Sequence, residues 1–234
     1  MLIIFALRSL LFYLGFYSSL LIYACLCLII GPFLTLPQRY PFFLCWNHFV
    51  VFWLKFSCGI RVKINGRENI PNEAIVIVSN HQSPWETIYL YIVFNPVSAI
   101  LKRELLSIPF FGWALSLLKP IAIDRKRKFR ARNQLLQQGK EKLSSGISVL
   151  IFPEGTRVSP GVHKPYQTGG SALAIEEGVK ILPVAHDAGH YWPSGKFLKK
   201  PGTIRLVIGQ ALDSQGREVR ELNQEIEQWI RQAL

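Results

Sequence analysis

Residues 74–86 read AIVIVSNHQSPWE, and they join an apolar run to the start of a helix through a short polar turn. The run at 74–78 is typical of a buried strand, because it is rich in β-branched residues and contains no polar one. Ser83 with Pro84 after it marks the beginning of a helix, and Glu86 stands where a capping box has its acid. A strand that passes directly into a helix predicts one unit of an α/β domain.

The same alternation continues along the chain from residue 61 onward. Further apolar runs that predict strands occupy 121–123, 149–152, 181–184 and 204–208. Helical stretches are predicted near 85–94, 103–118, 129–144, 168–177 and 215–233. The pattern therefore predicts an α/β fold, and 234 residues suffice for one catalytic domain with an appendage.

The first 60 residues differ from the rest, since Arg8, Arg39 and Lys55 are their only charged residues. Residues 10–31 contain no charge, and as a helix they would extend roughly 33 Å, enough to cross a hydrocarbon core of about 30 Å. The second apolar run, 41–54, would be about 20 Å long, so it is predicted to be interfacial or re-entrant. Together the two runs could form a hairpin dipping into one leaflet.

This composition predicts two parts, with membrane-anchoring helices at 1–58 and a catalytic domain at 59–234. A cleaved signal peptide or the core helix of a soluble protein are the alternatives for the first part. The apolar run is longer than a signal peptide requires, and no small-x-small cleavage site follows it. All four cysteines fall in this part without CxxC spacing, so they are interpreted as small apolar side chains rather than disulfide or zinc ligands.

The formal net charge of +12 favours an anionic partner. A basic surface suits lipid headgroups, phosphorylated substrates, coenzyme A or nucleic acid, so charge alone leaves the partner open. The basic run at 125–132 is by default a solvated helix face. Beside a membrane anchor, contact with lipid headgroups is the better functional interpretation, and nucleic acid is not expected.

His81 and Glu86 are candidates for acid–base chemistry at the end of the first strand. Active sites of α/β sheets lie at the carboxyl ends of strands, and a carboxylate beside a histidine fixes the imidazole tautomer and stabilises the imidazolium. In the alternative interpretation, Glu86 only caps the helix and His81 only occupies a turn. The local sequence leaves both open.

A second candidate segment, FPEGTR at 152–157, follows the most apolar strand. Gly155 permits a tight turn, while Thr156 and Arg157 offer a hydroxyl and a bidentate guanidinium to a phosphate. Alternatively, the segment is an ordinary polar loop.

With both segments in one chain, the sequence resembles the glycerolipid acyltransferase family that includes 1-acylglycerol-3-phosphate acyltransferases, over roughly residues 65–210. The family's NHxxxxD block is matched by Asn80, His81 and Glu86, with an acid one carbon longer. Its other blocks are matched, in order, by KPIAIDR at 119–125, FPEGTR at 152–157 and ILPVA at 181–185. Lys119 replaces the usual glycine of the second block, and QTGG at 167–170 lacks the lysine common before the glycines.

The resemblance implies a mixed central sheet flanked by helices, a fold like that of glycerol-3-phosphate acyltransferase, with a membrane-embedded helical segment at the amino terminus. It implies transfer of a fatty acyl group from acyl-CoA or acyl carrier protein to the sn-2 hydroxyl of lysophosphatidate, giving phosphatidate. His81 would be the general base and Glu86 would orient it. Residues implied at the substrate phosphate are Arg157, Arg125, Lys102, Glu154, Gly155 and Thr156.

No cofactor beyond the acyl donor and no metal is expected, although His186, Asp187 and His190 include a metal-type spacing. Expected partners are membrane lipids, lysophosphatidate and the donor, with the catalytic domain on the cytoplasmic side of the inner membrane. Two alternatives stay open. The chain could acylate another lysolipid, or it could be a non-catalytic membrane protein that binds anionic lipids.

Overall fold

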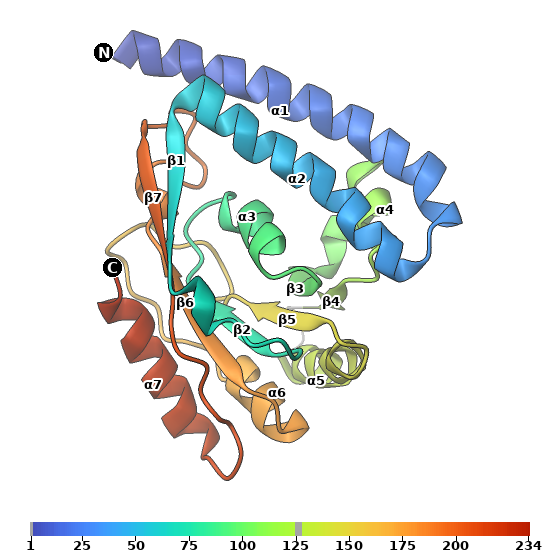
Figure 1. Ribbon diagram of the computed structural model, residues 1–234, viewed down its shortest axis with the longest axis vertical. Coiled ribbons are helices and arrows are strands. Elements are labelled where there is room, and N and C mark those ends of the chain that lie inside the picture. Colours follow the sequence, from blue (N-terminus) through green and yellow to red (C-terminus); the bar gives the residue numbers. More distant parts are fainter. Residues whose placement is uncertain (1, 125–127) are drawn as a thin grey trace.

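A computed structural model describes residues 2–124 and 128–234, and its centre is a sheet of seven strands in the order β1-β7-β6-β2-β5-β3-β4 (Figure 1). The strands are β1 Ile60–Asn65, β2 Val76–Ser79, β3 Val97–Lys102, β4 Ile121–Ile123, β5 Ser148–Ile151, β6 Ile181–His186 and β7 Gly202–Ile208. All neighbours are parallel except β6 and β7. The predicted mixed sheet is therefore confirmed.

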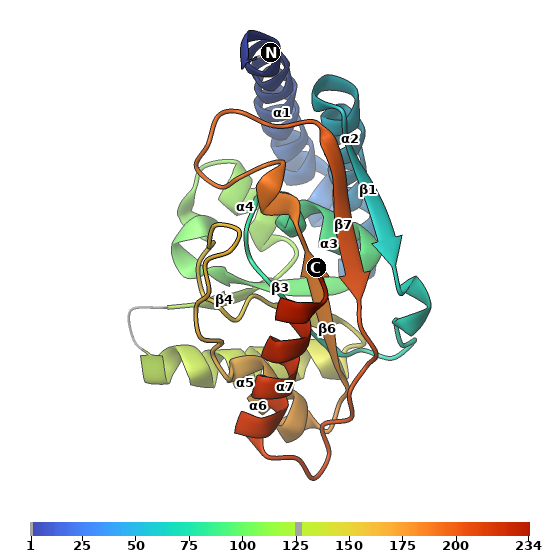
Figure 2. The same ribbon diagram turned by 90° about the vertical axis from the view of Figure 1, so that its left-hand side faces the viewer.

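Helices cover both faces of this sheet (Figures 1 and 2). The α-helices are α1 Leu2–Ile30, α2 Leu36–Cys58, α3 Glu86–Val93, α4 Phe111–Ser116, α5 Lys128–Ser144, α6 Gly169–Glu177 and α7 Val219–Gln232. Short 3₁₀ turns are η1 Gly31–Phe33, η2 Arg67–Asn69, η3 Arg103–Ser107 and η4 Ala188–His190. The helices α1 to α4 lie above the sheet in Figure 1, and α5 to α7 lie below it.

Strand β2 shows why both faces are covered. Ile77 packs into one hydrophobic core with residues of α1, α2 and α3, while Val76 and Val78 pack into a second core with α5, α6 and α7. Every residue of β2 is buried. Successive side chains of a strand point to opposite faces, so a continuous apolar run requires cover on both sides.

The five predicted strands are all present, with ends shifted by up to two residues. The strands β1 and β3 were not predicted. Strand β1 alternates basic and apolar residues at the edge of the sheet, and its exposed side carries Arg61 and Lys63. The predicted helix at 103–118 is divided into η3 and α4, because Pro109 lacks the N–H that a continuous helix needs.

The helices α1 and α2 lie antiparallel along one another, joined by hydrogen bonds from side chains to the backbone. The indole Nε1 of Trp53 donates to the carbonyl of Phe12 at 3.2 Å, and the hydroxyl of Tyr23 donates to the carbonyl of Phe42 at 2.5 Å. Helix α1 begins earlier than predicted, and α2 extends well beyond the predicted run at 41–54.

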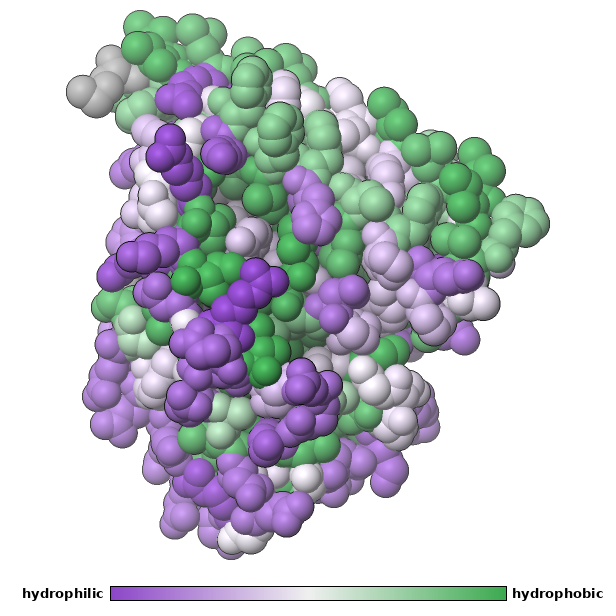
Figure 3. Space-filling model, in the orientation of Figure 1, coloured by the Kyte–Doolittle hydropathy of each residue, from purple (hydrophilic) through white to green (hydrophobic). Residues whose placement is uncertain are grey.

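Helix α1 is long and apolar enough to cross a membrane, and only 17% of its most apolar window is buried. A core helix of a soluble protein would be mostly buried. The outer surface of α1 is instead strongly apolar along its length (Figure 3). Its exposed large apolar side chains include Leu2, Ile3, Leu7, Leu14, Tyr17, Leu21, Ile22 and Ile29. Burying this surface in lipid would remove it from water, which indicates membrane association.

Candidate active site

The candidate site lies where β2, β5 and β6 end side by side. Strand β2 pairs with β5 on one side and β6 on the other, and all three run parallel. Their carboxyl ends therefore bring together three segments that are distant in sequence: the turn at 80–85, the loop after β5, and the end of β6. Brought together in this way, the three segments form one site.

His81 and Glu86 form a direct pair at this edge. The Nδ1 atom of His81 lies 2.8 Å from Oε1 of Glu86. The same oxygen accepts the backbone N–H groups of Gln82 and Ser83 at 2.9 and 2.8 Å. Glu86 therefore does what both interpretations of the sequence required, because it binds backbone N–H groups of the turn and also contacts the imidazole. Helix α3 has its N-cap at Trp85, however, and not at Ser83.

The imidazole of His81 is oriented with one nitrogen available. Because a carboxylate only accepts hydrogen bonds, Nδ1 carries the proton and Nε2 presents a lone pair. No hydrogen bond from the described residues reaches Nε2. The His81 side chain is 14% exposed and that of Glu86 is 0% exposed, so an incoming molecule can reach the imidazole and not the carboxylate. The ring of Phe152 stacks on the imidazole at 4.2 Å and limits its rotation.

The carboxylate of Glu86 is held in its charged form although it is fully buried. Burial favours the neutral acid and so raises the pKa. The nearby imidazole of His186, the hydrogen bond from His81 and the backbone N–H of Ser83 outweigh burial, and the pKa of Glu86 lies below its usual value. A charged carboxylate beside His81 is the arrangement that stabilises an imidazolium.

His186, at the end of β6, is buried beside Glu86. Its side chain is 0% exposed, and burial lowers its pKa. The Nε2 atom of His186 lies 2.8 Å from the carbonyl oxygen of Asn80 and 3.8 Å from Oε2 of Glu86. The side chain of Asn80 in turn bonds both the backbone N–H and the carbonyl of His186, at 3.0 and 2.8 Å. This clamp fixes the end of β2 against the end of β6.

The segment 152–157 folds against the His81 turn. The carboxylate of Glu154 accepts the backbone N–H of His81 at 3.2 Å, and the N–H of Val158 donates to the carbonyl of His81 at 2.8 Å. The Nε atom of Arg157 donates to the carbonyl of Ser83 at 3.2 Å. Three bonds thus join the two candidate segments that the sequence identified separately.

Gly155 is required at the turn of this loop. Its φ of 70° is in the left-handed region, and a Cβ there would lie 2.8 Å from the side-chain nitrogen of Gln167. Glu154 is buried behind the turn, whereas Thr156 and Arg157 are exposed. The guanidinium of Arg157 is therefore exposed next to the turn that contains His81.

The remaining predicted phosphate residues lie further along the sheet. Lys102 ends β3, is exposed, and lies 3.8 Å from Glu104. Arg125 lies outside the described residues, two positions after the end of β4. The structure therefore brings His81, Glu86, Glu154 and Arg157 together and leaves Lys102 two strands from β2.

Polar atoms without a partner are concentrated here. Among the described residues, six buried side-chain atoms have no hydrogen-bond partner. Four of them belong to Gln82, Trp85, Glu86 and Glu154. Each such atom costs free energy, and clusters of them are typical of functional sites. Among the described residues, no three His, Cys, Asp or Glu side chains come together in a group that could hold a metal ion.

Burial of Glu154 predicts a dependence of stability on pH. Burial raises the pKa of Glu154 from 4.5 to about 7. The folded protein then binds a proton that the unfolded chain has already lost, so the free energy of unfolding should fall as the pH rises from about 4.5 to about 7. Glu154→Gln keeps an acceptor for the N–H of His81 and removes the titration. The melting temperature of the variant relative to wild type should be higher at pH 8 than at pH 5. A difference independent of pH would contradict this.

The sequence interpretation missed the roles of His186, Asn80 and Phe152 around the pair. Asn80 and Phe152 belonged to recognised motifs, but nothing local gave their contacts. A histidine that ends a wholly apolar strand, as in ILPVAH at 181–186, was the available signal for His186.

Comparison with known proteins finds relatives of this chain. A sequence model of the acyltransferase family matches residues 61–187. The 1-acyl-sn-glycerol-3-phosphate acyltransferase of Pseudomonas aeruginosa is 47% identical over 98% of this chain and 91% of its own. The mouse 1-acyl-sn-glycerol-3-phosphate acyltransferase alpha is 31% identical over 69% of this chain and 58% of its own.

A solved structure also resembles this fold. The crystal structure of the 1-acyl-sn-glycerophosphate acyltransferase PlsC from Thermotoga maritima superposes with a TM-score of 0.80, at 25% identity, over 97% of this chain and 93% of the other. The family match covers both candidate segments and more than half of the chain. The protein therefore belongs to the acyltransferase family and is an acyltransferase.

Proposed function

We propose that this acyltransferase moves a fatty acyl group from a thioester to the sn-2 hydroxyl of lysophosphatidate, giving phosphatidate for phospholipid synthesis. The observation that carries the proposal is the His81–Glu86 pair, at 2.8 Å, together with the exposed Arg157, whose Nε is bound to the carbonyl of Ser83 in the same turn. An alcohol and an anionic phosphate of one small molecule would meet these two groups. The names of the relatives support the same acceptor.

In the proposed mechanism, Nε2 of His81 takes the proton of the hydroxyl as its oxygen attacks the thioester carbonyl. The carbon–sulfur bond of the tetrahedral intermediate then breaks, and the imidazolium returns its proton to the leaving thiolate. Glu86 stabilises the imidazolium between these steps. The nucleophile belongs to the substrate, so the step needs no acyl-enzyme and no cofactor beyond the acyl donor, which would be acyl-CoA or acyl carrier protein.

The phosphate of the acceptor would be bound by the guanidinium of Arg157 and the hydroxyl of Thr156. Gly155 and the buried Glu154 would shape their loop, and Arg125 and Lys102 would add positive charge. Arg157 suits this role because its Nε is held by Ser83 while, among the described residues, nothing binds its terminal nitrogens.

We further propose that residues 1–58 anchor the protein and residues 59–234 catalyse, on the cytoplasmic side of the inner membrane. The apolar outer surface of α1 supports the anchor.

The test uses the purified full chain with labelled lysophosphatidate and, separately, acyl-CoA and acyl carrier protein donors. Phosphatidate as the main product supports the proposal and identifies the donor. Preference for an acceptor without a terminal phosphate would favour the alternative lysolipid substrate. Absence of transfer with either donor, while anionic lipid still binds, would favour a non-catalytic protein.

Arg157→Ala is expected to raise KM for lysophosphatidate about tenfold to a hundredfold, because hydrogen bonds to a charged group are worth about 1.5–3 kcal/mol. Arg157→Lys keeps the charge and loses the bidentate geometry, so its KM should lie between those of wild type and alanine. Initial rates at varied acceptor concentration measure both. Arg220→Ala, at an exposed arginine of α7, should leave KM unchanged. An unchanged KM in Arg157→Ala would exclude it from phosphate binding.

A further inference from the structure

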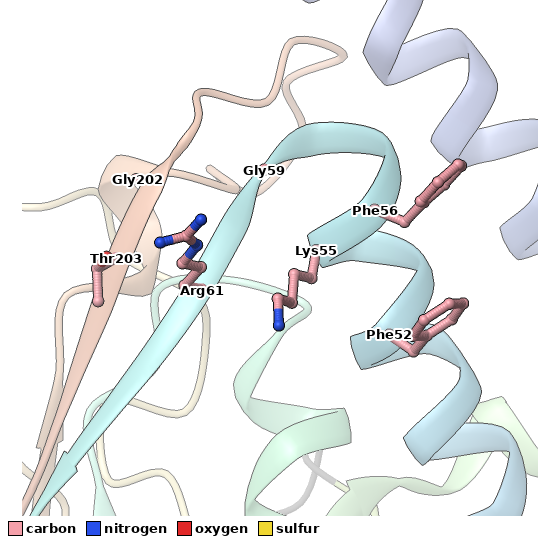
Figure 4. Close-up of a pocket in the computed structure, with 7 residues that line it drawn as sticks. All are labelled: Phe52, Lys55, Phe56, Gly59, Arg61, Gly202 and Thr203. Carbon is pink, nitrogen blue, oxygen red and sulfur yellow. The ribbon is translucent and has the colours of Figure 1, made fainter.

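A second candidate ligand site lies at the opposite end of α2 from its connection to α1. A cavity of about 410 Å³ opens between the last turns of α2 and the first residues of β1 and β7 (Figure 4). It is lined by Phe52, Lys55, Phe56, Gly59, Arg61, Gly202 and Thr203. None of these residues belongs to the His81 site. The volume is within the range of about 300–1,000 Å³ common for small-molecule sites.

The cavity is positively charged without compensation. Lys55 and Arg61 are exposed, and neither has a carboxylate within ion-pair distance among the described residues. Residues 1–67 and 188–212, which supply the walls, contain no Asp or Glu at all. Lys55 lies in the last turn of α2, where a positive charge complements the helix dipole. Arg61 lies in a strand, so the helix dipole does not account for its position beside the cavity.

Arg8 of α1 adds a third cation behind the wall. Its Nε donates to the carbonyl of Ser57 at 2.7 Å. A Cβ at Gly59 would lie only 2.8 Å from its Nη2, so the guanidinium abuts the cavity wall at Gly59. The φ of 70° at Gly59 lets the chain turn from α2 into β1 and bring Arg61 round beside Lys55.

An apolar surface borders the cavity. Phe52 and Phe56 are 63% and 66% exposed, and their rings stack at 6.4 Å one turn apart on α2. They are directed away from the side chains of Lys55 and Arg61 (Figure 4). The apolar outer surface of α1 lies alongside α2 (Figures 1 and 3). Positive charge at the border of an apolar surface is the arrangement found where a protein meets the phosphates of a membrane.

We propose that this cavity binds the phosphate headgroup of an anionic phospholipid from the membrane that receives α1. Lys55 and Arg61 contact the phosphate, and Phe52 and Phe56 lie at the level of the first acyl carbons. The adjoining apolar surface of Phe52 and Phe56 distinguishes such a lipid from a free phosphate, which would use the cations alone. The cavity would bind a phospholipid of the surrounding membrane. This binding does not depend on which lysolipid is acylated at the His81 site.

The test measures lipid binding by the full chain in nonionic detergent. Fluorescent phosphatidylglycerol is titrated by anisotropy, and saturable binding with one lipid per chain is expected. Lys55→Gln with Arg61→Gln should weaken this binding about thirtyfold, since each basic residue near an anionic headgroup contributes about a factor of five. Lys63→Gln with Arg220→Gln removes the same charge from the next exposed position of β1 and from α7, and should change binding less than threefold.

Four outcomes would overturn the proposal. Equal weakening in both double variants would mean diffuse attraction without a site. Loss of binding in Arg157→Ala would place the lipid at the His81 site. Equal binding of fluorescent phosphatidylcholine, or complete displacement by millimolar inorganic phosphate, would remove the requirement for an anionic lipid. Activity is not the readout, so failure of the proposed acyl transfer would leave this result interpretable.

Discussion

His81→Ala is expected to lower kcat for acyl transfer by about a thousandfold, within the range of about 10²–10⁴ that general acid–base groups contribute. The variant removes the nitrogen that takes the hydroxyl proton and later returns a proton to the thiolate. The KM for lysophosphatidate should change little, because the phosphate would be bound by Arg157 and its loop. Initial rates with purified protein, at saturating donor and varied acceptor, separate the two parameters.

A matched control for the loss of a histidine is His48→Ala. His48 is exposed on α2, and no hydrogen bond or ion pair among the described residues joins it to His81 or Glu86, so the kcat of His48→Ala should equal that of wild type. The backbone bonds from Glu154 and Val158 to residue 81 do not need the imidazole, so the variant should keep its fold, which circular dichroism can check. If folded His81→Ala retained near wild-type kcat, the proposed base would be wrong.

The pair itself could be predicted because it is local. Residues 81 and 86 are separated by one turn and the start of one helix, so a strand, a Ser-Pro helix start and an acid were enough to place them near one another. The segment 152–157 was a candidate phosphate loop for a similar reason, since Gly155 and Arg157 have recognisable local chemistry, but an ordinary polar loop stayed open until the family resemblance was added.

The contacts of Glu154 and His186 could not be predicted in this way. Glu154 bonds the backbone of residue 81, and His186 lies beside Glu86, only because β5 and β6 flank β2 in the sheet. Strand order depends on the packing of whole helices on both faces, and a residue's own neighbours in sequence carry little information about it. Family resemblance supplied the order of the blocks but no distances between them.

The missed strands illustrate a second limit. Strand β1 has basic residues at alternate positions because one of its sides faces solvent, so it contains no continuous apolar run. The buried strands β2, β5 and β6 are continuous apolar runs and were recognised. The long apolar stretch at the amino terminus was correctly predicted as helical, but its side-by-side packing with α2 depends on tertiary contacts such as that of Trp53 with Phe12.

Glu86→Gln is expected to lower kcat by about a hundredfold or more while leaving the turn intact. The amide oxygen can still accept the N–H groups of Gln82 and Ser83, so the local fold keeps its bonds. What is lost is the negative charge that stabilises the imidazolium of His81 when it holds the substrate proton. In a fully buried position this charge has no solvent to replace it. The KM for lysophosphatidate should change less than threefold, as measured by initial rates.

Glu86→Asp provides the decisive comparison, because it keeps the charge and shortens the side chain by one carbon. Aspartate is also the acid usual in the family's NHxxxxD block. Its kcat should therefore lie well above that of Glu86→Gln, although a longer distance to Nδ1 of His81 would keep it below wild type. If Glu86→Gln were as active as wild type, Glu86 would be only a helix-capping residue. If the aspartate variant were as inactive as the glutamine variant, geometry rather than charge would be the contribution of this residue.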